Sequence, residues 1–141
     1  MKKTVIILFA LFLTVGIINA QDKNQSQAKE QPTQKKIAPK FIVEDFVFAA
    51  NAINNVEITG AEAEGFVQVK NYMLSVINSI NQAGKQAQEQ IQIEMPIPIA
   101  QAMVTLLQRA KFTGANAEKY VRFVNAIVES SKEPLPETKT K

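Results

Sequence analysis

The residues best suited to catalysis are two glutamates, Glu64 and Glu118, which occupy the same position in a repeated motif. Residues 59–67 read TGAEAEGFV, and residues 113–121 read TGANAEKYV, 54 positions later. Two carboxylates held together can perform acid–base work or ligate a hard cation. Perturbed carboxylates mark functional sites in some proteins, so this pair is the enzymatic hypothesis that the sequence offers.

The other letters of the motif favour a structural explanation. Thr59 and Thr113 are suitable N-cap residues, because a helix start needs acceptors for its free backbone N–H groups. Glu62 follows Thr59 by three residues and completes a capping box, whereas the second copy has Asn116 there. If both copies of the motif start a helix, the same capping requirement explains why they contain the same residues, and no catalytic role is needed. We therefore expect no catalytic, metal-binding or cofactor-binding residue, and a protein that is not an enzyme.

The composition excludes several further chemistries. The 141 residues contain no Cys, no His and no Trp. Zinc, haem, iron–sulfur and copper sites rest mostly on His or Cys ligands, and thiol nucleophiles and Ser–His pairs need the same residues. The two aspartates, Asp22 and Asp45, are too few for an EF-hand calcium loop. No glycine-rich phosphate-binding motif occurs, so we expect no cofactor.

The charge argues against a nucleic-acid partner. The formal net charge is +3, from 16 basic and 13 acidic residues, but Lys2 and Lys3 belong to the leader described next. Without those two lysines the balance is +1, and the remaining basic residues are scattered along the chain. Nucleic-acid binding requires a concentrated basic face.

Residues 1–20 have the three parts of a secretory signal peptide. Lys2 and Lys3 are followed by an apolar run from Thr4 to Ile18, and cleavage is expected after Ala20. The leader resembles those of exported bacterial proteins. We predict a periplasmic or secreted protein with no stable membrane anchor once the signal is cleaved. The alternative is a signal-anchored membrane protein, because the apolar run is at the short end of what spans a bilayer.

The composition divides the remaining chain into three parts. Residues 21–40 are rich in Gln and Lys and are predicted to be a disordered linker. Residues 41–130 form the predicted helical domain. Residues 131–141 are a predicted disordered tail, in which Pro134 and Pro136 stop the preceding helix near residue 130.

Apolar periodicity predicts four helices within the domain. They are expected over residues 41–54, 61–90, 99–110 and 115–130, and the second helix ends either at Gly84 or one or two turns later in the Gln-rich stretch. Between the second and third helices, the isoleucines of residues 91–99 alternate as in a strand. Pro96 and Pro98 cannot donate ladder hydrogen bonds, so we expect an extended connector, with an edge strand as the alternative.

The repeat extends without gaps from residues 55–67 to residues 109–121, with a helix before and after each copy. Two helix–turn–helix hairpins, over about 41–90 and 98–130, would form one all-α four-helix bundle with internal duplication. Alternating apolar residues precede each motif, and we expect the two turns to pair as short strands. These residues are Val56, Ile58, Ala110 and Phe112.

We therefore predict a non-enzymatic interaction or structural module. The helix over 41–54 is apolar around most of its circumference, which is typical of a helix that is buried on several sides or docks onto another chain. On the second interpretation we expect a protein partner or a homo-oligomer. A second hypothesis is a small carrier that encloses an apolar ligand in the helical core. Its expected lining is Phe46, Phe48, Phe66 and Met73. The remote third hypothesis is an enzyme that uses Glu64 and Glu118.

Overall fold

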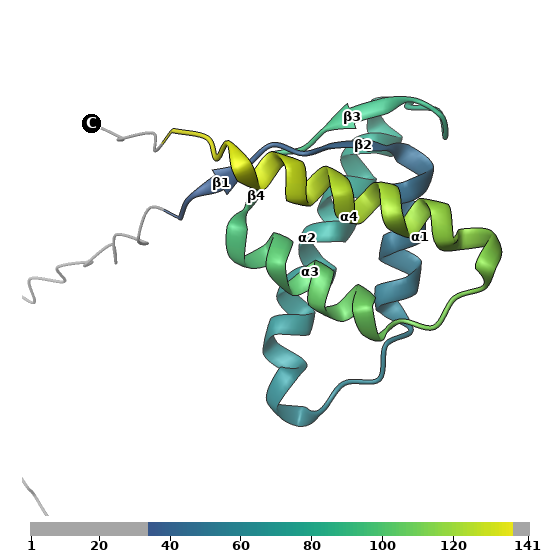
Figure 1. Cartoon of the computed structure of the whole chain (residues 1–141), viewed down its shortest axis with the longest axis vertical. Helices are drawn as coiled ribbons and strands as arrows, with labels where there is room; N and C mark the ends of the chain where they lie inside the picture. The colour runs from purple at the N-terminus through teal and green to yellow at the C-terminus, as the bar shows by residue number, and fades with distance from the viewer. Residues whose placement is uncertain (1–33, 137–141) are drawn as a thin grey trace, which may run out of the picture. The chain divides into compact units, whose positions relative to one another are not determined.

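The computed structural model describes residues 34–136, which form four α-helices and four short strands (Figure 1). The elements are β1 (Lys36–Ile37), β2 (Lys40–Ile42), α1 (Val43–Asn54), α2 (Ala63–Gln82), β3 (Gln90–Gln92), β4 (Met95–Pro96), α3 (Ile97–Arg109) and α4 (Ala117–Lys132). The 3-10 turns η1 (Gly60–Glu62) and η2 (Gly114–Asn116) lead directly into α2 and α4. The predicted four-helix arrangement is confirmed. The predicted signal peptide lies outside the described residues.

The strands form one interrupted antiparallel ribbon. Strand β1 pairs with β4, and β2 pairs with β3. Both pairings keep a single register, with Ile37 opposite Met95 and Phe41 opposite Ile91. Across the interruption, the N–H of Ile93 donates to the carbonyl of Pro39 at 3.1 Å. The segments 36–42 and 90–96 are therefore paired at both ends, and this hydrogen bond joins them across the interruption.

The C-terminal end of α4 is attached to this ribbon, and α4 packs on β1 and β2 (Figure 1). The hydroxyl of Ser130 accepts the N–H of Ala38 at 2.9 Å, at the point where the strand is interrupted. Beyond the helix, the N–H of Leu135 donates to the carbonyl of Lys36 at 2.9 Å. The segment that follows α4 is therefore hydrogen-bonded to the start of the described chain.

Three predictions about extended segments were wrong. Strands β3 and β4 lie within residues 90–96, in agreement with the edge-strand alternative and not with the extended connector that we expected. The prolines are tolerated because Pro96 lies at the end of the ribbon and Pro98 lies in the first turn of α3, where a missing N–H costs little. The predicted linker extends too far, since residues 36–40 belong to the ribbon. The turns before η1 and η2 form no strands, because the segments before α1 and α3 pair instead.

Of the two ends considered for the helix over 61–90, the structure has the earlier one, at Gly84. Helix α2 ends at Gln82, and Gly84 follows with φ of 64°. This left-handed conformation is usual just after a helix end, and glycine adopts it without a steric cost. The N–H of Lys85 then donates to the carbonyl of Ile80 at 3.1 Å, which closes the end of the helix.

Corresponding helices and 3-10 turns in the two halves of the domain start 54 residues apart. Helices α1 and α3 begin at Val43 and Ile97, and the same spacing separates η1 from η2 and α2 from α4. Hydrogen bonds at the helix entries follow it as well. The N–H of Val43 donates to the carbonyl of Glu89, and the N–H of Ile97 donates to the carbonyl of Lys35, both at 3.0 Å. The spacing of the sequence motif is thus also the spacing of the architecture.

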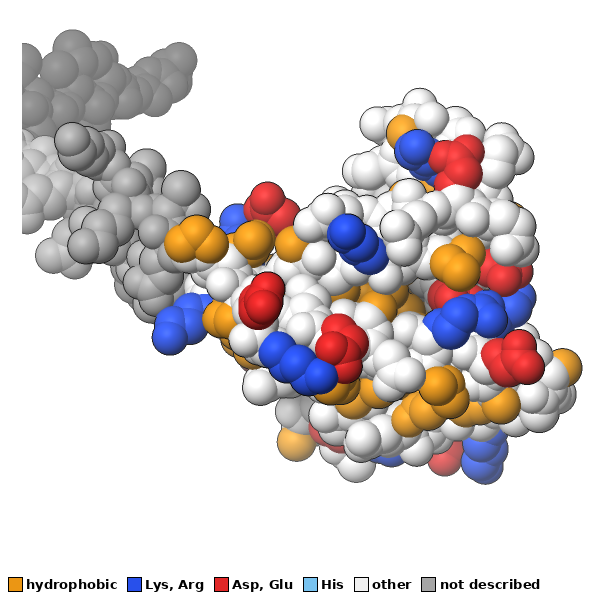
Figure 2. All heavy atoms as spheres, turned by 45° about the horizontal axis from the view of Figure 1, so that its top comes forward, with side chains coloured by type: hydrophobic (Ala, Val, Ile, Leu, Met, Phe, Trp, Pro, Cys, Tyr) orange, Lys and Arg blue, Asp and Glu red, His pale blue; other side chains and the backbone are white. Residues whose placement is uncertain are grey.

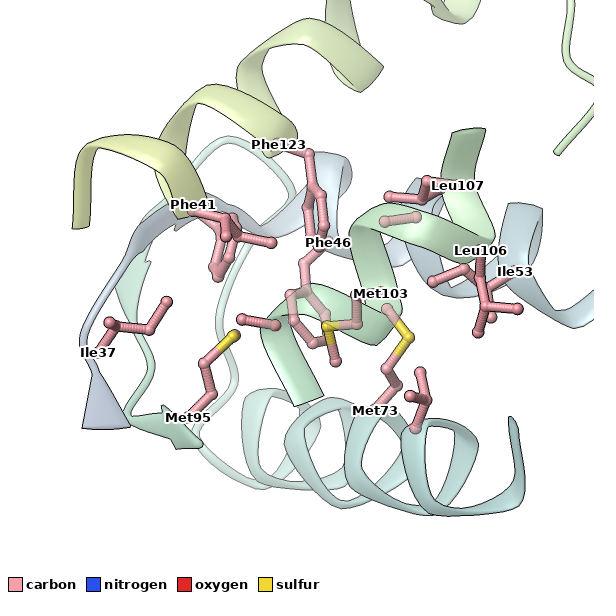
Figure 3. Close-up of a cluster of buried hydrophobic side chains, with 14 of the residues drawn as sticks. Ile37, Phe41, Phe46, Ile53, Met73, Met95, Met103, Leu106, Leu107 and Phe123 are labelled. Atoms are coloured by element: carbon pink, nitrogen blue, oxygen red, sulfur yellow. The ribbon is translucent and has the colours of Figure 1, made fainter. Parts of the chain in front are cut away.

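The hydrophobic core lies between the ribbon and the four helices (Figure 3). The rings of Phe41 and Phe123 stack with centroids 4.6 Å apart, and Phe46 meets Phe41 edge-on at 5.5 Å. Met73 and Met103 bring the side chains of α2 and α3 into the same cluster. Because these large side chains are fully buried, they account for much of the hydrophobic stabilisation.

Candidate interaction surfaces

Two helices carry large apolar side chains on their solvent-facing side. Val67 and Leu74 on α2, and Val121 and Val128 on α4, are 45–51% exposed. Within residues 34–136 the one other large apolar side chain that is similarly exposed is Phe112. The two residues of each helix are seven positions apart and share a face, which is the spacing of a helix–helix seam. We call these faces the α2 stripe (Val67, Leu74) and the α4 stripe (Val121, Val128).

The stripes correspond to each other residue by residue. Val67 and Val121 are 54 positions apart, and so are Leu74 and Val128. The opposite faces of both helices are occupied by the core, where Met73 and Phe123 are buried. Single exposed apolar residues are common on protein surfaces. A pair of exposed apolar residues that recurs at equivalent positions of a second helix, with similar exposure, is more specific evidence of a contact surface.

A cleft of about 200 Å³ lies between α1 and α2. Ile53 and Met73 are buried at its base, and polar groups come from Asn51, Asn54 and Lys70. Its remaining lining residues are Ala50, Phe66, Leu74 and Ile77.

The four residues that were expected to line a ligand site do not lie together. Phe46 is packed in the core, and Phe48 meets Phe112 edge-on with ring centroids 5.5 Å apart. Phe66 and Met73 do line the cleft. Two of the four expected lining residues therefore border the α1–α2 cleft.

Helices α1 and α4 are joined by an ionic network that the sequence analysis missed. Arg122 donates two hydrogen bonds to Asp45, at 2.8 and 2.6 Å, although Asp45 is only 1% exposed. These hydrogen bonds raise the pKa of Arg122. Lys119 lies 3.1 Å from Glu44, and its hydrogen bond lowers the pKa of that carboxyl group. The network is a structural tie, since its charges are paired within the protein.

The capping role predicted for Glu62 is confirmed for the half of the capping box that the Glu62 carboxylate forms. Its Oε2 accepts the N–H and the hydroxyl of Thr59, at 2.8 and 2.9 Å. Its Oε1 accepts a hydrogen bond from Arg109, which also donates to the carbonyl of Glu57. The Thr59 N–H, with help from the other two donors, lowers the pKa of Glu62 to about 2. Arg109 was missed as a partner because it lies 47 residues further along the chain.

The structure does not assemble the two repeat glutamates into a site. Glu118 has a side chain that is 90% exposed, and its carboxylate is 3.9 Å from Arg122 on the next turn of α4. Glu64 is exposed in the first turn of α2 and makes no ion pair within residues 34–136. In this described part, no group of three or more acidic, His or Cys side chains could hold a metal ion.

The remaining surface gives little indication of a specific ligand class. Acidic and basic side chains are interspersed on the face shown in Figure 2, with hydrophobic groups between them. None of the helices within residues 34–136 has the length and apolar character needed to cross a membrane. No family model, no curated protein and no solved structure matches the chain.

Proposed function

We propose that this chain is an exported, non-enzymatic helical module that binds protein, and that it associates with a second copy of itself. The observation that carries the proposal is the repeated pair of exposed apolar residues on α2 and α4. Each stripe has the seven-residue spacing that allows one helix to pack along another. Because one chain carries both stripes, the α2 stripe of one copy can pack on the α4 stripe of another.

Charge favours one orientation of the contact. If the α2 stripe packs antiparallel on the α4 stripe of a second copy, Val67 lies opposite Val128 and Leu74 lies opposite Val121. Glu64, one turn before Val67, then lies near Lys132 of the second copy. A parallel contact would set Glu64 against Glu118, and like charges at a helix seam are unfavourable.

The expected association is weak. Fully burying a Val or Leu side chain contributes roughly 1.5–3 kcal/mol, and half of that surface is already covered in the single chain. Four such side chains therefore contribute roughly 3–6 kcal/mol, which offsets at most the lower end of the association cost of about 4–15 kcal/mol. Self-association at millimolar protein therefore also requires contacts beside the stripes, such as that between Glu64 and Lys132. We expect an equilibrium that is populated at high protein concentration.

Static light scattering over a micromolar to millimolar concentration series tests this proposal. The mean mass of the wild-type protein should rise with concentration above that of one chain. Leu74→Asp and Val128→Asp should each lower the mass at a given concentration. Ser75→Asp is the matched control, since it places the same charge on a neighbouring exposed position of α2 outside the stripe. A monomer at every concentration that binds no apolar dye would refute self-association.

We propose export because residues 1–20 have the organisation of a cleavable signal. These residues lie outside the part of the chain that the structure describes. Sequencing the N-terminus of the protein recovered from a cell envelope extract tests the proposal. Gln21 should be the first residue, whereas an intact Met1 in the membrane fraction would indicate the signal-anchored alternative.

We also propose that the domain consists of two copies of a strand–helix–turn–helix unit. The shift of 54 residues supports this, because it exchanges the two sides of the ribbon. It moves Ile37 to Ile91, which is the partner of Phe41, and it moves Phe41 to Met95, which is the partner of Ile37. The same shift maps the charged pair Arg109 and Glu62 onto Asn55 and Asn116, a pair that is neutral at both ends.

Transfer of the missing glutamate tests whether the two turns are equivalent. Asn116→Glu should give Thr113 the capping carboxylate that Thr59 has, and should raise the free energy of unfolding by about 0.5–1 kcal/mol. Asn125→Glu adds the same charge to an exposed site on α4 that has no N–H groups to cap. Equal effects of the two substitutions would contradict the equivalence.

A further inference from the structure

The α1–α2 cleft has the dimensions of a small-ligand site. Its volume is about 200 Å³. A protein cavity of about 150 Å³ lined by Leu, Ile and Phe is large enough to bind benzene. The base of this cleft is similarly apolar, with Ile53, Phe66, Met73 and Ile77 from the two helices. A short alkyl chain would therefore fit in contact with these side chains.

Lys70 gives the cleft its chemical polarity. Its side chain is exposed at the edge of the apolar base, and within residues 34–136 it forms no ion pair. The neighbours of Lys70 one turn away on α2 are Phe66, Val67, Met73 and Leu74, none of which is acidic. Asn51 and Asn54 contribute amide groups from α1. An unpaired ammonium beside an apolar hollow is complementary to an anion that carries an apolar group.

We propose that the α1–α2 cleft binds an alkyl monocarboxylate, with the alkyl chain on the apolar base and the carboxylate at Lys70. The site belongs to the first half of the domain alone. The position equivalent to Lys70 in the second half is Val124, which has no charge. The position equivalent to Phe66 is Tyr120, whose ring stacks on Phe112 at 5.2 Å. The cleft shares Leu74 with the α2 stripe, so a bound ligand and a second copy would compete for this part of α2.

Octanoate is the probe for the experiment, and it is titrated into the purified protein at a concentration where light scattering finds a single chain. Binding is followed by two-dimensional NMR, which reports the position of the contact as well as the affinity. Octanol supplies the same chain without charge, and acetate supplies the charge without the chain. Lys70→Gln removes the ammonium from an exposed position. Lys111→Gln is the matched control, because this exposed lysine lines a different cleft, between the α1–α2 and α3–α4 loops.

The proposal predicts that octanoate shifts the signals of Phe66, Lys70 and Met73. Lys70→Gln should weaken octanoate binding about two- to fivefold, which is the range for an exposed ion pair. Octanol should bind more weakly than octanoate and should be insensitive to Lys70→Gln, acetate should not bind, and Lys111→Gln should bind octanoate as the wild type does.

Three results would overturn the inference. The first is the absence of shifts at the cleft up to the concentration at which octanoate forms micelles. The second is an octanoate affinity that is equal in the wild type and in Lys70→Gln, or reduced equally by Lys111→Gln. The third is octanol binding as tight as octanoate binding, which would indicate an apolar site without anion recognition. Shifts at the cleft that appear on concentrating the protein alone would assign it to the contact between copies.

Discussion

Arg122 on α4 binds the buried carboxylate of Asp45 on α1 through two hydrogen bonds, from Nε to Oδ2 at 2.8 Å and from Nη2 to Oδ1 at 2.6 Å. A bidentate, charge-assisted contact of this kind fixes both distance and orientation. The residues at the corresponding positions of the other half are Gln68 and Ile99. The ion pair therefore ties α1 to α4, and the equivalent positions on α2 and α3 cannot form one.

Breaking this ion pair should destabilise the fold, and the loss should depend on which of its two residues is replaced. Asp45→Asn leaves Arg122, which is partly exposed and also contacts Glu44, so we expect a loss of about 1–2 kcal/mol in the free energy of unfolding. Arg122→Ala leaves a buried carboxylate without its partner, and should cost more. Chemical denaturation measures both values. A greater loss for Asp45→Asn than for Arg122→Ala would contradict the argument.

Glu62 should make the stability pH-dependent in acid. Its pKa in the folded protein is about 2, below the ordinary value of 4.5. The ionised carboxylate therefore stabilises the fold above pH 4.5, and this contribution is lost as the pH falls from 4.5 towards 2. The difference in unfolding free energy between the wild type and Glu62→Gln should be constant above pH 5 and should shrink in that interval.

Glu64→Gln is the control for this measurement. Glu64 lies two residues further along and, within residues 34–136, makes no ion pair. We expect a smaller difference from the wild type at neutral pH. The explanation through Thr59 and Arg109 fails if the two substitutions have the same effect across the whole pH range.

Two glycines should respond to alanine in opposite directions. Gly84 has φ of 64°, and a Cβ there would meet nothing within 4 Å, so Gly84→Ala should cost about 1–2 kcal/mol through backbone strain alone. Gly65 lies within α2, and its Cβ would also point into open space. Gly65→Ala should raise the stability by about 0.5–1 kcal/mol. Thermal unfolding measures both variants. Melting temperatures that shift in the same direction would contradict this prediction.

The helices were predictable because their signals are local. Apolar periodicity located all four, Thr59 and Glu62 located the turn before α2, and Gly84 lies just beyond the end of that helix. The ribbon was not predictable in the same way, because its register joins residues 36–42 to residues 90–96. One local signal was overlooked. The stretch from Lys36 to Phe41 places lysines at exposed positions and Ile37, Pro39 and Phe41 at buried ones.

The candidate surfaces were only partly predictable. The repeat drew attention to Glu64 and Glu118, whereas its equally constant valines, Val67 and Val121, form the exposed apolar surface. Periodicity alone indicates that these valines lie beside the apolar face of each helix. Whether a neighbouring helix covers them depends on packing between segments far apart in sequence. The same limit applies to Asp45, which binds Arg122 across 77 residues.

The most direct test of self-association is disulfide trapping, which is unambiguous because the chain has no cysteine of its own. A disulfide requires the two Cβ atoms to be about 3.5–4.5 Å apart. The antiparallel contact predicts that chains with Val67→Cys and chains with Val128→Cys, mixed under mild oxidation, form a mixed disulfide dimer. Mixing Val67→Cys with Val121→Cys should give much less. A dominant Val67–Val121 cross-link, or no cross-link in either mixture at millimolar protein, would contradict the proposed contact.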